Sequence, residues 1–184
     1  MKAYILVEGP QDAEVFKRLL AQQLQQGVEF VAGNGISRPA SLARSLLVRR
    51  RKPLAIVVDS KSVDPRIVRE RRESTEELVK SVAAHVPVKV IVAVPEIEAV
   101  FFHDPGVLER FFGRKLPGEL LSLGRRDPVG VLRELSGQSN AQWDTVKSLD
   151  ALDAPDVEVM RAAPVVKELT AFLEQIQHAS KAGA

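Results

Sequence analysis

Short apolar runs alternate with longer amphipathic segments along the first half of the chain. Residues 3–7, 54–58 and 88–94 are almost continuously apolar and rich in β-branched side chains, and residues 28–32 form a weaker run. Runs of this length, flanked by Gly or Pro, are typical of strands that are buried on both faces of a sheet. The pattern therefore predicts four strands in this half.

The segments between these runs carry apolar side chains at helical spacing. Residues 11–26, 38–51 and 65–85 each have an apolar stripe along one face of a helix. Strands that alternate with helices are joined by crossovers, and such crossovers give a mostly parallel sheet. We expect an α/β fold of the Rossmann-like kind, with a four-stranded, mostly parallel sheet and helices on both faces.

The pattern changes after the fourth predicted strand. Prolines divide the remainder into short helical pieces, and residues 137–160 are polar enough to predict an irregular segment. The predicted helical pieces span residues 96–103, 106–113, 117–123, 128–136 and 164–178. We expect an α/β domain over residues 1–103 and a helical extension over residues 104–184 that packs on the same domain.

Composition removes several kinds of chemistry. The 184 residues include no cysteine, which excludes disulfides, a thiol nucleophile and Cys-based metal sites. The three His are not spaced as a ligand pair, and the net charge of +2 neither supports nor excludes a nucleic-acid partner. No apolar stretch is long enough for a membrane span, and the N-terminal segment has no secretory cleavage pattern. A soluble, cytoplasmic protein is expected.

Carboxylates follow three of the four predicted strands. Glu8 ends the first strand and Asp12 begins the next helix, Asp59 ends the third strand, and Glu96 and Glu98 follow the fourth. Because parallel strands end at the same edge of a sheet, we expect these side chains to converge. Converging carboxylates repel, so they either take up protons or bind a cation. A site made only of oxygen atoms suits Mg²⁺ or Mn²⁺.

Each of these acids also has an ordinary structural explanation. Asp12 and Glu96 suit the positive end of a helix, and Asp59 suits a loop cap. The explanation is weaker for Glu8 and Asp59 together, because each ends a run of buried positions, where a charged group is unfavourable without a partner.

The opening segment Ile5-Leu6-Val7-Glu8-Gly9-Pro10-Gln11-Asp12-Ala13-Glu14-Val15 resembles the first motif of the Toprim domain. That domain is shared by type IA and type II topoisomerases, bacterial primases and OLD-family nucleases. The turn Gly33-Asn34-Gly35 and Asp59 at the end of the third strand are similar to its further motifs. The resemblance covers roughly residues 1–100 and implies a Toprim-like fold with a divalent-metal site.

A second segment, Pro95-Glu96-Ile97-Glu98-Ala99-Val100-Phe101-Phe102, is similar to one in small standalone Toprim-like proteins and OLD-type nucleases. There an acid after the fourth strand joins the metal cluster. The resemblance thus implies Glu8, Asp59 and Lys61 as catalytic residues. It implies metal ligands among Glu8, Asp12, Asp59, Asp64, Glu96 and Glu98.

Lys61 departs from the Toprim pattern, which has a second Asp at this position in an Asp-x-Asp motif. A lysine there would occupy the space of a second cation or contact a phosphate as a point charge. Asp64, Glu96 and Glu98 are alternatives for the missing ligand. The substitution leaves open whether the protein is an enzyme.

Three functions are consistent with this pattern. The first is a Mg²⁺- or Mn²⁺-dependent nuclease, or a related phosphoryl-transfer protein, acting on DNA or RNA. Asn34, Arg114, Lys115, Arg125 and Arg126 are its candidate contacts to phosphate or nucleic acid. Residues 66–77 interleave Arg with Glu, which predicts a solvated helix instead.

The second function is that of a catalytically degenerate Toprim subunit that regulates a partner, for example an ATPase in an antiphage system. The chain has no P-loop of its own, so ATP hydrolysis would come from that partner. The third is a receiver-like domain in which Asp59 accepts a phosphoryl group. The Glu-Gly-Pro after the first strand, where a receiver has an acidic pair, disfavours this third function.

Overall fold

The computed structural model describes residues 3–33, 39–83, 86–137 and 144–182. The strands are β1 (Ala3–Val7), β2 (Val28–Ala32), β3 (Leu54–Asp59) and β4 (Val88–Ala93). The helices are α1 (Pro10–Leu19), α2 (Gln22–Gln25), α3 (Pro39–Arg50), α4 (Pro65–Lys80), the 3₁₀ helix η1 (Ile97–Phe102), α5 (Pro105–Phe112), α6 (Gly118–Gly124), α7 (Pro128–Leu135), α8 (Thr145–Asp150), α9 (Ala154–Arg161) and α10 (Pro164–Ala182).

The strands form one parallel sheet in the order β2-β1-β3-β4. The α/β fold with a parallel four-stranded sheet is therefore confirmed. β1 and β3 are neighbours, with Leu6 opposite Ile56. Because the strands run in the same direction, Glu8 and Asp59 leave adjacent strands at the same edge of the sheet.

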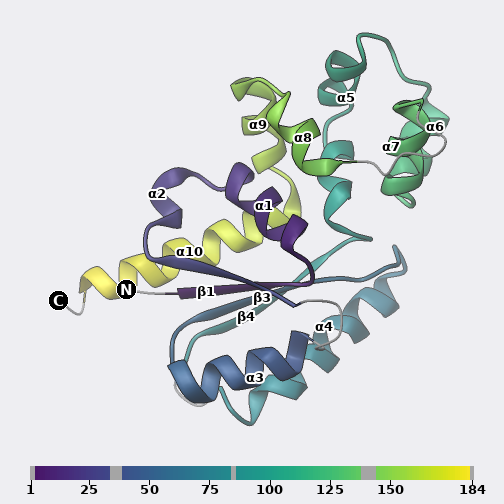
Figure 1. Cartoon of the computed structure of the whole chain (residues 1–184). Helices are drawn as coiled ribbons and strands as arrows, with labels where there is room; N and C mark the ends of the chain where they lie inside the picture. The colour runs from purple at the N-terminus through teal and green to yellow at the C-terminus, as the bar shows by residue number, and fades with distance from the viewer. Residues whose placement is uncertain (1–2, 34–38, 84–85, 138–143, 183–184) are drawn as a thin grey trace.

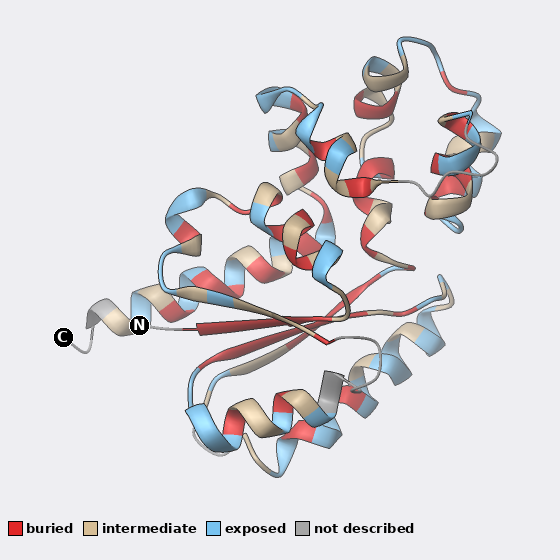
Figure 2. Cartoon of the chain, viewed as in Figure 1, coloured by how far each residue is buried: buried red, intermediate tan, exposed pale blue. Residues whose placement is uncertain are grey.

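Side chains alternate between two cores along each strand. Ile5 and Val7 of β1 belong to a cluster that includes residues of α1 and α10. Tyr4 and Leu6 belong to a second cluster with residues of α3 and α4. Figure 1 shows α1 and α10 on one side of the sheet and α3 and α4 on the other, and Figure 2 shows the buried strands between them. Helices on both faces are thus also confirmed.

Asp-Pro pairs begin three of the later helices. Asp64, Asp104 and Asp127 each precede the first proline of a helix and accept a backbone N–H from its first turn. Proline suits this position because its missing N–H has no partner in a helix there, while Asp supplies the cap. These local signals explain why the starts of these three helices could be predicted from the sequence.

The C-terminal helices continue the same core. α8 and α9 contact α1, and α10 contacts β4. One cluster of buried residues joins Ile5 of β1 with Leu108 of α5, Leu132 of α7 and Leu169 of α10. No helix in the described part of the chain is long and apolar enough to cross a membrane. A domain boundary near residue 103 stays a prediction.

Two local predictions were wrong. Residues 145–161 are not irregular but form α8 and α9, because Asp144 and Asp153 cap two helices too short to show an apolar stripe. The single helix predicted for residues 11–26 ends at Leu19, where Leu20 adopts an extended backbone. The short helix α2 follows it.

Candidate functional site

The ends of β1 and β3 are joined through Glu8. Its Oε1 atom accepts the backbone N–H of Asp59 at 3.2 Å. The Glu8 carboxylate therefore reaches the backbone at the end of the adjacent strand. The Asp59 side chain is 13% exposed, so most of its carboxylate is shielded from water.

Asp12 supports the turn between β1 and α1. Its Oδ2 atom accepts the N–H of Gly9 at 2.9 Å, and Pro10 begins the helix. This contact caps α1 and keeps the Asp12 carboxylate beside Glu8. Burial raises the pKa of Asp12, and the charge of Glu8 raises it further. Asp12 thus serves the helix start and also belongs to the acidic group.

Lys61 bridges two acids from different strands. Its Nζ atom lies 2.7 Å from Oδ2 of Asp59 and 3.1 Å from Oε2 of Glu96. The acidic edge, as we call Glu8, Asp12, Asp59, Glu96 and Glu98, is therefore partly neutralised by a lysine from its own loop.

The turn that carries Lys61 is held in an unusual conformation. Lys61 has φ = 54°, in the left-handed region that non-glycine residues rarely adopt. The N–H groups of Ser60 and Lys61 donate to the carbonyls of Ala93 and Pro95 at 2.9 and 2.8 Å. The end of β4 thus holds this turn, and the turn brings the lysine back toward the strand ends.

The acids affect one another electrostatically. Burial raises the pKa of Asp59 to about 7, against the opposing effect of Lys61, and the charges of Glu8 and Asp12 contribute. Partial burial lowers the pKa of Lys61, but its hydrogen bonds and charge interactions with Asp59 and Glu96 raise it more. The site therefore holds more acid than its bases can balance.

Glu98 completes the edge from η1. The hydroxyl of Thr145, at the start of α8, donates to its Oε1 atom at 3.1 Å. Burial raises the pKa of Glu98, and the charges of Glu96 and Asp12 raise it further. The C-terminal helices therefore contribute to the site, which sequence patterns did not predict.

Arg71 is a site residue that sequence reasoning missed. Its Nη2 atom lies 3.1 Å from Oε1 of Glu8, although we predicted the Arg-rich helix to be solvated. The spacing of residues along the helix indicates this position of Arg71, because Arg71 lies four residues before Thr75, which is buried. Residues four apart share a face of a helix, so this arginine borders the sheet.

Other predicted site residues are not brought to the acidic edge by any described contact. Asp64 caps α4 and pairs with Arg66 at 3.0 Å. Lys115 pairs with Glu109 at 2.7 Å and its side chain is 92% exposed. Arg114 and Arg126 are exposed. Arg125 lines a cavity together with Glu96. Asn34 lies outside the described residues.

The donor chemistry of the acidic edge fits Mg²⁺ or Mn²⁺, because all its ligand atoms are carboxylate oxygens. Within the described ranges, however, no three acidic or His side chains are already arranged to hold an ion. The Lys61 amine lies between Asp59 and Glu96, so a metal there requires the lysine side chain to move away. That side chain is 63% exposed, which leaves room for such a movement.

No protein-family model matches this chain, and no curated protein or solved structure does.

Proposed function

We propose that this protein is a Mg²⁺- or Mn²⁺-dependent nuclease, or a related phosphoryl-transfer protein, of the Toprim type. The contact between Glu8 and the Asp59 N–H at 3.2 Å carries the proposal, because it joins the two strand-end acids of that motif in one half-buried site. A stable fold gains nothing from gathering five acids where burial raises the pKa of three of them.

Glu8 and Asp59 would hold the cation, with Asp12, Glu96 and Glu98 around it. A bound Mg²⁺ or Mn²⁺ would polarise a phosphoryl oxygen and make a bound water easier to deprotonate. The chain's own residues have separate tasks. Asp12 keeps its carboxylate beside Glu8 through the hydrogen bond to Gly9, and Thr145 orients Glu98.

Two basic side chains at this edge suit a phosphate. One N–H group of Arg71 donates to the Glu8 carboxylate, and the guanidinium has other N–H groups that can reach a phosphate oxygen. Lys61 would supply a point charge once its amine leaves Asp59. Both would offset the repulsion between a phosphate and the acids.

Cleavage assays with conservative variants test this function. Purified protein should cleave DNA or RNA with Mg²⁺ or Mn²⁺, and Glu8→Gln or Asp59→Asn should abolish cleavage while the fold is retained. Asp64→Asn is the matched control, since Asp64 caps α4 and Asn is also a good cap. Calorimetry should show Mn²⁺ binding that Glu8→Gln weakens and Asp64→Asn leaves unchanged. Cleavage that survives Glu8→Gln, or no binding of either metal, would reject the proposal.

A second function is favoured by Lys61. Its amine lies 2.7 Å from Asp59 and 3.1 Å from Glu96 and neutralises part of their charge. The lysine thus takes the place that a metal ion would have in an active site. In that case the protein is a degenerate Toprim subunit that regulates a partner such as an ATPase. Wild-type protein would then bind no Mn²⁺, and co-purification with an ATPase encoded beside it would support the regulatory function.

A further inference from the structure

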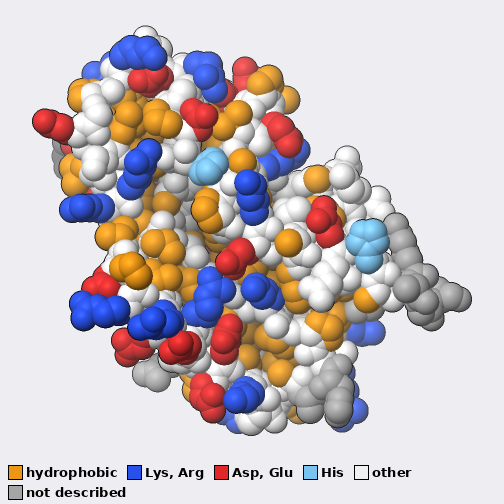
Figure 3. All heavy atoms as spheres, turned by 180° about the vertical axis from the view of Figure 1, so that it is seen from behind, with side chains coloured by type: hydrophobic (Ala, Val, Ile, Leu, Met, Phe, Trp, Pro, Cys, Tyr) orange, Lys and Arg blue, Asp and Glu red, His pale blue; other side chains and the backbone are white. Residues whose placement is uncertain are grey.

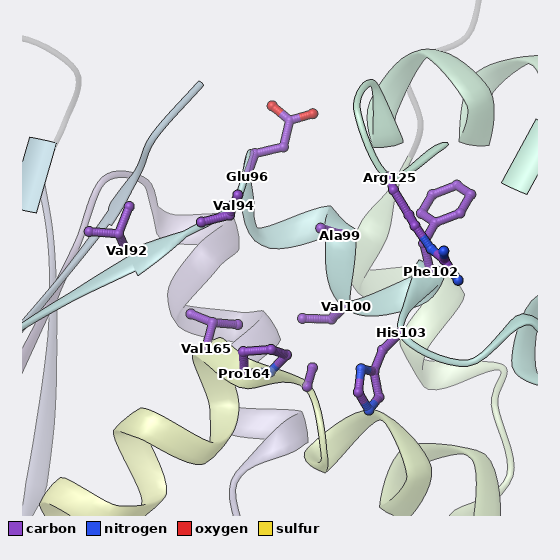
Figure 4. Close-up of a pocket in the computed structure, with 11 residues that line it drawn as sticks. Val92, Val94, Glu96, Ala99, Val100, Phe102, His103, Arg125, Pro164 and Val165 are labelled. Atoms are coloured by element: carbon purple, nitrogen blue, oxygen red, sulfur yellow. The ribbon is translucent and has the colours of Figure 1, made fainter. Parts of the chain in front are cut away.

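An apolar cavity opens beside the acidic edge and shares Glu96 with it. The cavity has a volume of about 410 Å³, and its walls come from β4, η1, the end of α6 and the start of α10. Glu96 lines it and also lies 3.1 Å from the Lys61 amine. Figure 4 shows Glu96 at one end of the cavity. A molecule in the cavity therefore lies next to Glu96, the member of the acidic edge that is among its lining residues.

The walls are mostly apolar, with charge at a few points. Phe102 and Arg125 lie on one side and Val94 and Val165 on the other, as Figure 4 shows. Seen from behind, the molecule has an apolar hollow between the upper helices and the sheet, with Lys and Arg side chains around it (Figure 3). Apolar walls with a few fixed polar groups are typical of a ligand site of this size.

Close packing fixes the position of Arg125. A Cβ atom at Gly124 would lie 1.9 Å from Cε1 of Phe102, so the end of α6 rests directly on the phenyl ring. Arg125 follows at once and is exposed. Among the described residues, neither Arg125 nor His103 has an ion-pair partner. An exposed guanidinium and an imidazole thus lie at an apolar cavity whose lining also includes Glu96.

We infer that this cavity receives one unpaired nucleobase of the strand that the acidic edge acts on, which makes single-stranded or frayed nucleic acid the preferred substrate. The inference rests on the proposed function. A base inside a duplex is stacked and paired, so it can enter such a cavity only after it is extruded at an energetic cost, which an unpaired base avoids. An extruded base presents two flat apolar faces to such walls, and a phosphate beside it suits Arg125.

An apolar side chain of a protein partner would fit the same walls. It would leave the guanidinium of Arg125 without an anionic partner, however. Charge therefore favours a nucleotide, which has an apolar base and an anionic phosphate in one unit.

Binding measured without metal tests the cavity apart from cleavage. The probe is a fluorescein-labelled single-stranded oligonucleotide in EDTA buffer, compared with the blunt duplex of the same sequence by fluorescence anisotropy. The single strand should bind about tenfold more tightly than the duplex, because one base stacked in a protein site contributes a factor of this order.

Two variants remove the cavity's contribution by different routes. Ala99→Leu fills the cavity and Arg125→Ala removes its charge, and each should weaken single-strand binding about fivefold to tenfold. Ala171→Leu, in a separate pocket beside α2 and α9, and Arg133→Ala, an exposed arginine on α7, are the matched controls and should leave the affinity unchanged.

The possible outcomes distinguish a failure of the cavity inference from a failure of the proposed function. Equal binding of duplex and single strand, or unchanged affinity in both Ala99→Leu and Arg125→Ala, would overturn the inference and favour a protein partner for the cavity. Metal-dependent cleavage that both cavity variants retain in full would reject the cavity and leave the proposed function standing. Cavity-dependent binding by a protein that never cleaves would support the cavity and reject the nuclease.

Discussion

Two aspartates, the buried Asp156 in the C-terminal helices and the partly buried Asp59 at the acidic edge, each face one basic side chain in different surroundings. Asp156 of α9 is paired with Arg110 of α5, whose Nε and Nη2 atoms both donate to one carboxylate oxygen. Asp59 shares the single amine of Lys61 with Glu96 and also faces Glu8 and Asp12. The first pair joins two helices, whereas the second is one part of an excess of acid.

The difference shows what each region contributes. A planar guanidinium that meets a buried carboxylate through two donors is a strong and specific contact. An amine shared between two acids, with further acids nearby, leaves the ionised form of Asp59 unfavourable in the folded protein. Asp156 therefore stabilises the fold, while Asp59 is retained at the expense of stability. Removal of the partner of Asp156 should consequently destabilise the fold, whereas neutralisation of Asp59 itself should stabilise it.

The largest effect is expected for Arg110→Ala. The Asp156 side chain is 6% exposed, so removal of Arg110 leaves a buried carboxylate without its partner. We expect a clear fall in the free energy of unfolding, the largest among these variants, measured by urea denaturation. Arg133→Ala, an exposed arginine on α7, is the control and should change it by less than about 0.5 kcal/mol. A small change in the free energy of unfolding for Arg110→Ala would show that the ion pair between Arg110 and Asp156 does not stabilise the fold.

Asp59→Asn should act in the opposite direction and stabilise the metal-free protein. The pKa of Asp59 rises to about 7 on folding, so the folded state binds more protons than the unfolded state between about pH 4 and pH 7. The stability of the wild type then falls as pH rises through this window. At pH 8 the variant should be more stable by an amount on the order of 2 kcal/mol.

This advantage should shrink as pH approaches 4, where Asp59 becomes protonated in both states. Urea unfolding in EDTA at pH 5 and pH 8 measures it. A variant that is less stable than the wild type at pH 8 would mean that the Lys61 contact outweighs burial and crowding.

Lys61→Met tests the same excess of acid by removing a base from the acidic edge. Loss of the amine leaves Asp59 and Glu96 without their shared base, and we expect a loss of about 1 kcal/mol in EDTA. Millimolar Mn²⁺ should raise the melting temperature of this variant more than that of the wild type, because the lysine no longer competes with the metal. Lys115→Met, which removes an exposed partner of Glu109, is the control. Equal Mn²⁺ stabilisation of both variants would contradict a metal at the acidic edge.

The smallest effect is expected at an exposed acid outside the edge. Asp64→Ala removes the cap of α4 and should lower the free energy of unfolding slightly, by less than Lys61→Met does, while Asp64→Asn should be nearly neutral. Thermal denaturation of the two variants measures this difference. A larger loss in Asp64→Ala, or one that depends on Mn²⁺, would place Asp64 in the site after all.

Much of the site follows from local pattern. Apolar runs and helical stripes predicted the strands, and parallel strands put Glu8 and Asp59 at one edge. Helix starts at Asp-Pro pairs are also local, because the cap and the proline act within one turn. Helices α8 and α9 were missed because their caps, rather than an apolar stripe, define such short segments.

Contacts between distant elements needed the structure. Arg71 reaches Glu8 across 63 positions, and Thr145 reaches Glu98 across 47. The pattern of a charged helix predicts a solvated one unless its rotation on the sheet is known, and the rotation of α4 depends on its packing against β4 and α3. The cavity depends similarly on the approach of α6 to Phe102, which only Gly124 allows.

By itself the sequence determined the alternation of strands and helices, and with it the edge at which the acids meet. This holds because side-chain periodicity, which predicts the strands, is a local property of the sequence. Strands that run in the same direction end at the same edge of the sheet, so the acids that follow them lie at that edge. The tertiary structure alone decided that Lys61 bridges Asp59 and Glu96, that Arg71 binds Glu8, and that an apolar cavity adjoins the acids. Those features depend on how separate elements pack, because burial and distances of a few ångströms decide which charges meet.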